Sequence, residues 1–437
     1  MSDSTHSMKV LVIGSGGREH SLCWKIGKSP MVSEVICAPG NAGIGDVARI
    51  VAVAANDLDG LMALAEAERP GLVVIGPEDP LAAGLADRMR DAGFRVFGPG
   101  AEGAQLEASK AFSKDLIERH RIPTATARSF DRSGQAKGYL EGCTTWPQVV
   151  KADGLAAGKG VYICQDLAEA KVAVDGIMEE GRHGEAGAQI LIEEFLVGEE
   201  ASVFAITDGD AVLVLEPVQD HKQAYDGDEG PNTGGMGVYS PVPELSKRIY
   251  KQIEQHVLLP SIHMLRREKI PFRGVLFIGL MLTEGGPRVI EYNVRFGDPE
   301  TQVVLPRLTS SLVDLLWASA TGSAATGDGV ASVQVTFDDA AAVTVVMASA
   351  GYPESSSRGD VIGGVADADA LEGVQVLHAG TALDAERRLV TAGGRVLAVT
   401  ALGRDLEQAR ERAYGGVACI RFDGAQHRSD IGSAIDR

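Results

Sequence analysis

The sequence predicts a multidomain protein of mixed α/β and α+β class, and two observations support this. A chain of 437 residues that is 45% hydrophobic and only 5% aromatic has room for about three domains of roughly 150 residues each. The pattern of apolar runs and turns also changes twice along the chain. We therefore expect an open parallel-sheet domain at 1–107, a larger domain at 108–330 with an inserted lid at about 124–190, and a separate α+β domain at 331–437.

The first domain begins as strand, turn and helix. Lys9 to Ile13 is a β-branched apolar run, the glycine-rich residues 14–17 break it, and a helix is expected from near His20. Alternation of strands and helices is typical of a parallel sheet. Further strands are expected at 34–38, 72–75 and 95–97, and helices at 57–68 and 80–92.

The other two domains show different patterns. Helices are expected at 109–120 and 168–179, and strands at 148–152 and 189–195. The glycine-rich segment 220–241 is interpreted as a long binding loop, because such a stretch inside an enzyme more often binds than links. In the last domain, strands are expected at 343–348, 374–378, 387–390 and 395–402, and a helix at 405–414.

Composition excludes several classes of partner and places the protein in the cytoplasm. A formal net charge of -19 argues against nucleic acid and anionic membranes, which attract clustered Lys and Arg. Five scattered cysteines without a C-x-x-C pair favour reduced thiols over disulfides or zinc. We see neither a signal segment nor a membrane span. The sequence leaves open whether translation starts at Met1 or Met8, and what the oligomeric state is, a monomer included.

The turn at Gly14 to Glu19 begins like a dinucleotide-binding fingerprint but departs from it. Glu19 replaces the third glycine, and the second strand ends without an acidic residue for a ribose hydroxyl. A nicotinamide cofactor is therefore disfavoured. Backbone N–H groups at the helix start, assisted by Arg18 and His20, are candidates for holding a phosphate. The alternative is an ordinary tight turn.

A second glycine-rich segment runs from Lys151 to Gly160 and resembles a phosphate cradle. It is not a Walker A loop, because Gly154 to Gly158 is one residue too short and Gly160 stands where a hydroxyl would bind magnesium. We interpret it as a flexible loop that folds over polyphosphate while lysines neutralise the charge. Two solvated lysines beside a turn are the alternative.

Polar residues at two strand ends complete the candidate site. Glu193 and Glu194 end a strand where adenine is expected against backbone groups and ribose against a carboxylate. Alone this is a weak signal, and the alternative is a pair of solvated acids at a strand edge. Period-two alternation points Glu291, Asn293 and Arg295 to one face of another strand. A carboxylate and an amide oxygen suit magnesium, and an arginine nearby suits a transferred phosphoryl group.

These motifs, in this order, resemble the ATP-grasp ligases, and within them the glycinamide ribonucleotide synthetase family. The resemblance covers nearly the whole chain from Met8, and its longer motifs are specific. The matching segments are GSGGREH (14–20), PGNAG (39–43), GPE (76–78), SKAF (109–112), the loop 151–160, DHK (220–222), GPNTGGMG (230–237), RFGDPE (295–300), GDVI (359–362), HAGT (378–381) and DIG (430–432).

The resemblance implies a fold, a reaction and its cofactors. The fold is a pre-ATP-grasp domain, an ATP-grasp core with an inserted lid, and a C-terminal domain. The reaction joins glycine to 5-phosphoribosylamine through glycyl phosphate, giving glycinamide ribonucleotide, ADP and phosphate in purine synthesis. ATP and Mg²⁺, with Mn²⁺ as an alternative, are the implied cofactors. Because the chain ends soon after the C-terminal domain, we expect no fused later-pathway activity.

The resemblance also implies roles for individual residues. Arg295 and Lys151 are the catalytic candidates, and Glu291 and Asn293 the metal ligands. The nucleotide is expected at Lys110, Lys151, Gly154, Gly158, Lys159, Gly160, Glu193, Glu194, Leu196 and Glu200. The substrates are expected at Gly16, Gly17, Arg18, Glu19, His20, Asn41, Asp220, Lys222, Asn232, Thr233, Gly234, Arg295 and Asp298.

Departures from the family pattern are conservative and concern Tyr292, Val294 and Phe277. The strand at 275–282 lacks the upstream carboxylate that often completes an ATP-grasp metal site, so water, phosphate or another side chain is expected there. Two other functions stay open: an ATP-grasp ligase for a different acid or amine, and a noncatalytic binding protein.

Overall fold

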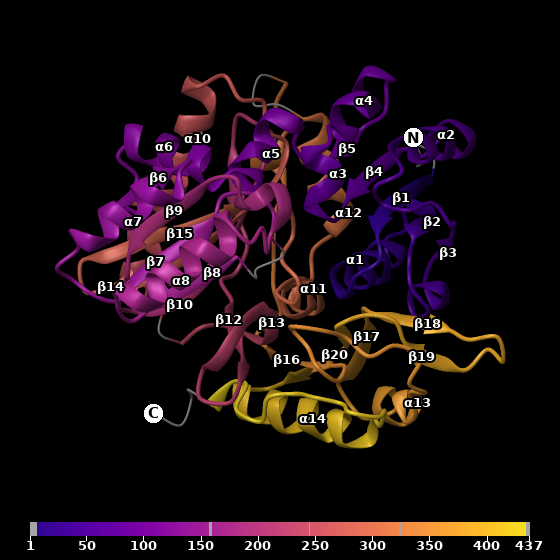
Figure 1. Cartoon of the computed structure of the whole chain (residues 1–437). Coiled ribbons are helices and arrows are strands. Elements are labelled where there is room, and N and C mark those ends of the chain that lie inside the picture. Colours follow the sequence, from indigo (N-terminus) through magenta and orange to yellow (C-terminus); the bar gives the residue numbers. More distant parts are fainter. Residues whose placement is uncertain (1–6, 157–159, 244, 323–325, 434–437) are drawn as a thin grey trace.

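Five parallel strands form the N-terminal sheet of the computed structural model, which describes residues 7–156, 160–243, 245–322 and 326–433. The order is β3-β2-β1-β4-β5, so the first strand is central, as expected for an open sheet (Figure 1). The strands are β1 (Met8–Gly14), β2 (Val32–Pro39), β3 (Arg49–Ile50), β4 (Leu72–Ile75) and β5 (Val96–Phe97). Between them lie α1 (Gly17–Gly27), η1 (Ile44–Asp46), α2 (Leu58–Glu68), α3 (Glu78–Ala82) and α4 (Leu85–Asp91).

The single helix predicted at 80–92 is wrong, because the structure has two. Gly84 lies between α3 and α4 with a φ of 82°, a left-handed conformation that interrupts a helix.

The central domain is built on an antiparallel sheet in the order β11-β10-β14-β15. Alternate residues of β14 enter two different hydrophobic clusters, Leu276 and Ile278 one, Val275 and Phe277 the other, so the sheet is buried on both faces. Both clusters also contain residues of the N-terminal sheet, which joins the two domains firmly. The strands are β10 (Glu199–Thr207), β11 (Val212–Val214), β14 (Gly274–Thr283) and β15 (Gly286–Asn293). Helix α5 (Ala101–Ala108) leads into this domain, whose own helices are α6 (Lys110–Arg119), α9 (Lys247–Ile253), η3 (Glu254–Leu258), α10 (Leu259–Arg267), α11 (Thr301–Arg307) and α12 (Leu312–Thr321).

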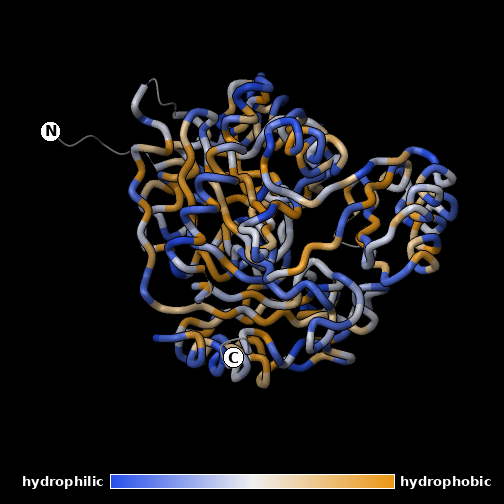
Figure 2. The backbone as a smooth tube through the Cα atoms, turned by 90° about the vertical axis from the view of Figure 1, so that its left-hand side faces the viewer, coloured by the Kyte–Doolittle hydropathy of each residue, from blue (hydrophilic) through white to orange (hydrophobic). Residues whose placement is uncertain are grey.

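The lid segment has a sheet and a hydrophobic core of its own. Its strands run antiparallel in the order β6-β9-β7-β8, and its core is separate from the other three clusters. Hydrophobic residues concentrate along the inner strands in Figure 2, with hydrophilic segments outside. Its elements are β6 (Ala127–Phe130), α7 (Ser133–Glu141), β7 (Gln148–Ala152), β8 (Val161–Cys164), α8 (Leu167–Met178), η2 (Gly184–Gly187) and β9 (Ile190–Glu194).

The C-terminal sheet begins with a hairpin from the middle of the chain. The order is β12-β13-β16-β20-β17, and β13 pairs with β16 (Figure 1). The strands are β12 (Gln219–Tyr225), β13 (Glu229–Ser240), β16 (Ala341–Ala348), β17 (Val374–His378) and β20 (Arg395–Gly403). The small sheet β18 (Thr381–Leu383) and β19 (Leu389–Thr391), the helices α13 (Val365–Asp369) and α14 (Leu406–Cys419), and η4 (Val330–Ser332) complete the chain.

The loop predicted at 220–241 is therefore wrong, because most of it is the β12–β13 hairpin. Its glycines serve close packing. A Cβ at Gly235 would lie 2.5 Å from Pro299 Cδ, and one at Gly237 would lie 2.5 Å from Ile431 Cδ1. The hairpin thus lies tightly between the central and C-terminal domains. In the described part of the chain, no helix is long and apolar enough to cross a membrane.

Candidate active site

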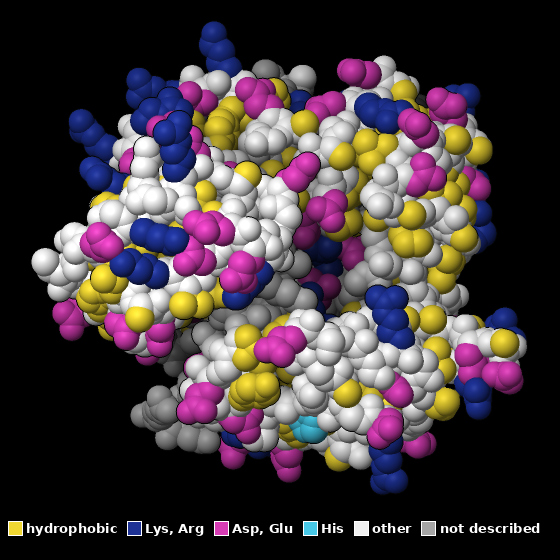
Figure 3. Space-filling view, viewed as in Figure 1, with side chains coloured by type: hydrophobic (Ala, Val, Ile, Leu, Met, Phe, Trp, Pro, Cys, Tyr) yellow, Lys and Arg dark blue, Asp and Glu magenta, His cyan; other side chains and the backbone are white. Residues whose placement is uncertain are grey.

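A cavity of about 360 Å³ lies where the lid, the central sheet, the N-terminal domain and the β12–β13 hairpin meet. Figure 3 shows a hollow between these parts, with Lys, Arg, Asp and Glu side chains on its walls. The predicted site residues that line the cavity are Arg18, Lys110, Lys151, Gly160, Glu193, Glu194, Leu196, Glu200, Asp220, Lys222, Asn232, Thr233, Gly234, Glu291, Asn293, Arg295 and Asp298. Six others, Gly16, Gly17, Glu19, His20, Asn41 and Gly154, are not among its lining residues. Gly158 and Lys159 lie outside the described residues.

Lysines gather at the lid end of the cavity. Lys151 Nζ lies 2.6 Å from Glu193 Oε2, and Lys114 Nζ lies 2.8 Å from Glu193 Oε1. Burial favours the neutral acid, but the two lysines hold the pKa of Glu193 below its usual value. Burial lowers the pKa of Lys110 and of Lys114. Two lysines share the Glu193 carboxylate and Lys110 lines the same cavity, so this end is rich in cations and suited to phosphate groups.

The start of the glycine-rich loop is held by helix α6. The Asp153 carboxylate accepts hydrogen bonds from Ala111 N at 2.6 Å and from Ser109 Oγ at 3.0 Å. Lys110 Nζ donates to Gly154 O at 3.0 Å. The first residues of the loop, Asp153 and Gly154, are therefore fixed against the start of α6, and the Lys110 side chain lies beside the loop backbone.

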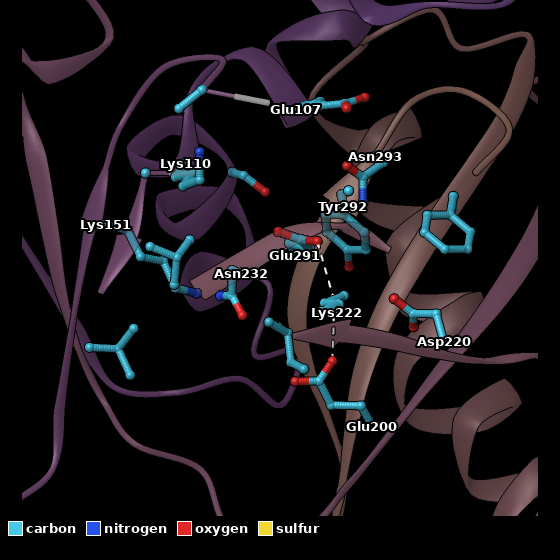
Figure 4. Close-up of a pocket in the computed structure, with 18 of the residues that line it drawn as sticks. Glu107, Lys110, Lys151, Glu200, Asp220, Lys222, Asn232, Glu291, Tyr292 and Asn293 are labelled. Carbon is cyan, nitrogen blue, oxygen red and sulfur yellow. Dashed lines mark ion pairs between the residues drawn. The ribbon is translucent and has the colours of Figure 1, made fainter. Parts of the chain in front are cut away.

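Lys222 bridges two carboxylates in the middle of the cavity, as the dashed lines of Figure 4 mark. Its Nζ lies 3.2 Å from Glu200 Oε2 and 3.8 Å from Glu291 Oε1. Burial alone would raise the pKa of Glu291, but Lys222, Lys151 and Lys110 lower it to about 2. Glu291 is thus ionised throughout the physiological range.

The fit of a metal rests on two oxygen donors from β15. The ionised Glu291 and Asn293 both line the cavity and are hard ligands that suit magnesium. Across the sheet, Gly279 pairs with Glu291, so β14 supplies no carboxylate at that position. The described residues contain no group of three or more His, Cys, Asp or Glu arranged to hold a metal ion. Water, phosphate or another side chain is the expected source of the remaining coordination.

Arg295 lies between two carboxylates that the sequence analysis did not select. Its Nη2 is 2.9 Å from Glu107 Oε1, and its Nε donates to Glu78 Oε2 at 3.2 Å. Burial raises the pKa of Glu107 to about 7, whereas the positive charges of Arg295 and Arg18 outweigh burial and lower that of Glu78 to about 2. Glu78 follows the buried strand β4, a position where parallel sheets commonly carry site residues, so it was within reach of sequence reasoning. Glu107 gave no such signal.

The helix start at Gly16 is filled by the protein itself. Gly16 N donates to Glu19 Oε2 at 2.6 Å, and a Cβ at Gly76 would meet Glu19 Oε1 at 2.0 Å. Glu19, which replaces the fingerprint's third glycine, thus places its carboxylate where a phosphate would bind in a dinucleotide fold. Contact between phosphoribosylamine and Gly16, Gly17 or Glu19 stays a prediction.

His20 and Asn41 join the N-terminal domain to the C-terminal domain. His378 N donates to His20 Nδ1 at 2.8 Å, and Asn41 Nδ2 donates to His378 O at 2.7 Å. Burial lowers the pKa of His20 to about 3 and that of His378 to about 4. Both rings are therefore neutral, and substrate contact by His20 or Asn41 also stays a prediction.

Arg395 is a third residue that sequence reasoning missed. From β20 its Nη1 donates to Gly234 O and to Asp298 O, both at 2.5 Å. Sequence reasoning could not select it, because a single arginine in a C-terminal strand belongs to no recognisable motif. It ties the hairpin to the loop that follows β15, and so keeps two walls of the cavity together.

Comparisons with known proteins match this architecture along almost the whole chain. Models of phosphoribosylglycinamide synthetase match in three parts: its N domain over residues 8–107, its ATP-grasp (A) domain over 108–301, and its C domain over 342–434. A phosphoribosylamine–glycine ligase of Caulobacter vibrioides is 48% identical over 425 residues, covering 97% of this chain and 98% of that protein. One of Chlorobaculum tepidum is 47% identical, covering 98% and 99%.

Solved structures agree. A phosphoribosylamine–glycine ligase of Thermotoga maritima superimposes with a TM-score of 0.84 at 33% identity, covering 97% of this chain and all of the other. The biotin carboxylase domain of a Hydrogenobacter thermophilus 2-oxoglutarate carboxylase has a TM-score of 0.71 at 17% identity, covering 97% of this chain and 92% of the other. The second similarity shows a shared fold.

Proposed function

The chain belongs to the phosphoribosylglycinamide synthetase family, and from that premise we propose that its cavity joins glycine to 5-phosphoribosylamine through glycyl phosphate, using ATP. Its activity is that of a phosphoribosylamine–glycine ligase (EC 6.3.4.13) in purine biosynthesis. The observation that carries the finer proposal is the meeting of a lysine-rich end with Glu291, Asn293 and Arg295 in one cavity.

The chemistry explains why these charges are needed. A carboxylate does not react with an amine until one of its oxygens is phosphorylated. Glycine and the γ-phosphate are both negative, so they can approach only where cations cancel the repulsion. Lys151 and Lys110 supply positive charge on the phosphate side, and Arg295 supplies it beside the strand end.

We assign the nucleotide to the lid side of the cavity. Its lining there includes the apolar side chains of Phe195, Leu196 and Met281, which suit the faces of an adenine ring. Glu194 and Glu200 remain the candidates for polar contacts with adenine and ribose. Both carboxylate oxygens of Glu193 form ion pairs with lysines, so we assign Glu193 the role of holding Lys114 and Lys151 in place.

Glu291 and Asn293 would hold Mg²⁺, or Mn²⁺ in its place. When bound, such an ion neutralises phosphate charge and polarises the γ-phosphoryl group. Glu78 and Glu107 contact the Arg295 guanidinium and fix its plane. An acyl phosphate would therefore share this guanidinium with the two carboxylates.

Closure of the lid would protect glycyl phosphate from hydrolysis. The segment at about 124–190 has its own core, so it can move as a unit, and it carries Lys151 and the glycine-rich loop. After closure the 5-phosphoribosylamine nitrogen attacks the acyl carbon and phosphate leaves.

Oxygen transfer tests the acyl phosphate directly. Glycine labelled with ¹⁸O in both carboxylate oxygens is supplied with ATP and 5-phosphoribosylamine, and the released phosphate is analysed by mass spectrometry. We expect one ¹⁸O atom in each phosphate formed. Unlabelled phosphate, with product still formed, would exclude the glycyl phosphate route.

A further inference from the structure

Two carboxyl groups in the cavity wall lack the partners that every other acidic residue there has. Asp220 on β12 is 6% exposed, Glu300 at the start of α11 is 5% exposed, and both line the cavity. Neither has an ion-pair partner among the described residues, and Asp220 Oδ1 has no hydrogen-bond partner there. The other cavity carboxylates lie within 4.0 Å of a cation; they are Glu78, Glu107, Glu193, Glu194, Glu200, Glu291 and Asp298.

Burial without a partner is costly for such groups. An unpaired carboxylate away from water loses several kcal/mol of solvation in rough terms, so a buried carboxyl without a partner in a cavity wall points to a catalytic role or to a bound ion, water or ligand. Burial, and then the negative charge of Asp220, raise the pKa of Glu300 to about 8, and Arg295 and Lys222 offset this only in part. Burial also raises the pKa of Asp220. A small cation is the ligand that satisfies both carboxyls.

We propose that Asp220 and Glu300 bind the ammonium group of the amino-acid substrate, which on the proposed function is glycine. This inference deepens that function and rests on it. Figure 4 shows Asp220 and Lys222 projecting from the same hairpin strand among the cavity residues. An ammonium donates three hydrogen bonds, enough to satisfy the lone Oδ1 of Asp220 and to reach Glu300 as well.

The surrounding charges match a zwitterion and disfavour the other substrate. Lys222 and Arg295 are the cations that act on Glu300, so positive and negative groups lie side by side. Glycine carries its two charges one carbon apart and needs such an arrangement. Phosphoribosylamine carries a phosphate, which a pair of buried carboxyls would repel. Glycine would thus lie with its carboxylate toward Lys222 and Arg295 and its ammonium toward Asp220 and Glu300.

Binding should then release a proton. With a pKa of about 8, Glu300 is largely protonated at neutral pH in the empty site, facing Asp220, Lys222, Arg295 and the neighbouring Arg395. Ammonium binding requires the ionised carboxylate. The KM for glycine should therefore fall as the pH rises toward 8.

Asp220→Asn and Glu300→Gln keep the side-chain shape and remove the charge. We expect each to raise the KM for glycine about 10- to 100-fold, the range for losing a hydrogen bond to a charged group, with the KM for ATP changed less than about twofold. Glu194→Gln is the matched control: it also lines the cavity, on the nucleotide side, and should alter the KM for ATP and leave that for glycine unchanged.

The outcomes separate this inference from the proposed function. If the wild type makes ADP only with glycine but both variants keep its KM and lose kcat instead, the pair acts as a general base and the ammonium site is wrong. If the wild type shows no dependence on glycine, the proposed function itself fails. Should the variants not fold, calorimetry of glycine binding to the wild type with a nonhydrolysable ATP analogue, in two buffers of different ionisation enthalpy, still decides: no proton release overturns the inference.

Discussion

Lys151 Nζ lies 2.6 Å from Glu193 Oε2, and this ion pair joins neighbouring strands at the lid end of the cavity. Val149 pairs with Glu193 in the register, so the pair is diagonal across β7 and β9. The second oxygen of Glu193 holds Lys114 of α6, outside the lid. One carboxylate therefore orders two lysines and connects the lid to the central domain.

Glu193→Ala should destabilise the protein. It leaves Lys114 and Lys151 buried without their counter-charge, a loss of about 3 to 5 kcal/mol for a buried pair. Urea unfolding followed by circular dichroism measures the free energy of unfolding. Glu199→Ala, at an exposed position, is the control and should change it by less than about 0.5 kcal/mol. An equal, small effect of both substitutions would refute the bridging role.

Glu291→Gln should nearly abolish ligation. The substitution keeps the shape but removes the negative charge that would hold the metal, and we expect kcat to fall by about 10²-fold or more. Initial rates at saturating ATP measure this, with a magnesium titration alongside. Removal of divalent cations with a chelator should stop the wild type, and added Mg²⁺ or Mn²⁺ should restore it. Glu284→Gln, at an exposed position beyond β14, should behave as the wild type does; full activity of the Glu291 variant would remove this residue from the metal site.

Acid should destabilise the protein through His20. Its pKa is about 3 when folded and 6.5 when unfolded, so below pH 6.5 the unfolded chain binds a proton that the folded protein does not. Stability is therefore fully present above 6.5 and decreases as the pH falls toward 3, by up to about 1.4 kcal/mol per pH unit from this group. His378, at about 4, acts in the same direction.

The measurement is the free energy of unfolding between pH 7.5 and 5. His20→Asn should flatten its pH dependence even if the variant is less stable overall. His263→Asn, at an exposed position, should leave the slope unchanged. An identical slope in the wild type and in the His20 variant would contradict the assignment.

Arg395→Ala should impair substrate binding more than nucleotide binding. The variant loses the hydrogen bonds to Gly234 O and Asp298 O, and the hairpin wall of the cavity is then held less firmly. We expect the KM of glycine or 5-phosphoribosylamine to rise about tenfold, and that of ATP to change little. Steady-state kinetics with each substrate varied in turn measures this, and Arg404→Ala, a solvent-exposed arginine of the same domain, is the comparison. A selective rise in the KM of ATP would count against the role given to the hairpin.

ATP and glycine together should protect the lid from proteolysis. If the segment at about 124–190 closes over the cavity, its cleavage by a limiting amount of protease should slow severalfold. Fragments identified by mass spectrometry locate the cuts, and cuts outside this segment serve as the internal reference. Unchanged cleavage within the segment would contradict closure.

Much of the fold could be predicted because local pattern and tertiary context agree. The apolar runs that end in turns became the strands of the parallel sheet, and the family and fold class are confirmed. The hairpin β12–β13 was predicted as a loop because several glycines close together usually indicate a flexible, irregular backbone. Here a side chain larger than glycine at position 235 or 237 would clash with Pro299 or Ile431. No local sequence pattern reveals these contacts.

The meeting of candidate residues in the cavity could be predicted where one strand carries them. Period-two alternation put Glu291 and Asn293 on one face, and both line the cavity with Arg295. Pairings between distant segments were not predictable. The contacts of Lys114 with Glu193, and of Arg395 with Asp298, join residues far apart in the sequence. Glu19 was predicted as a substrate contact and noted as the replacement of the third fingerprint glycine, but its hydrogen bond with Gly16 N at the helix start was not foreseen.

The most direct test of the central claim is ADP release with 5-phosphoribosylamine generated in the assay, measured with and without glycine. The account predicts ADP only when both glycine and the amine are present, together with a product heavier than the amine by one glycyl unit. ADP release that depends on neither, or that requires another acid or amine, would leave the ATP-grasp fold in place and contradict the proposed substrates.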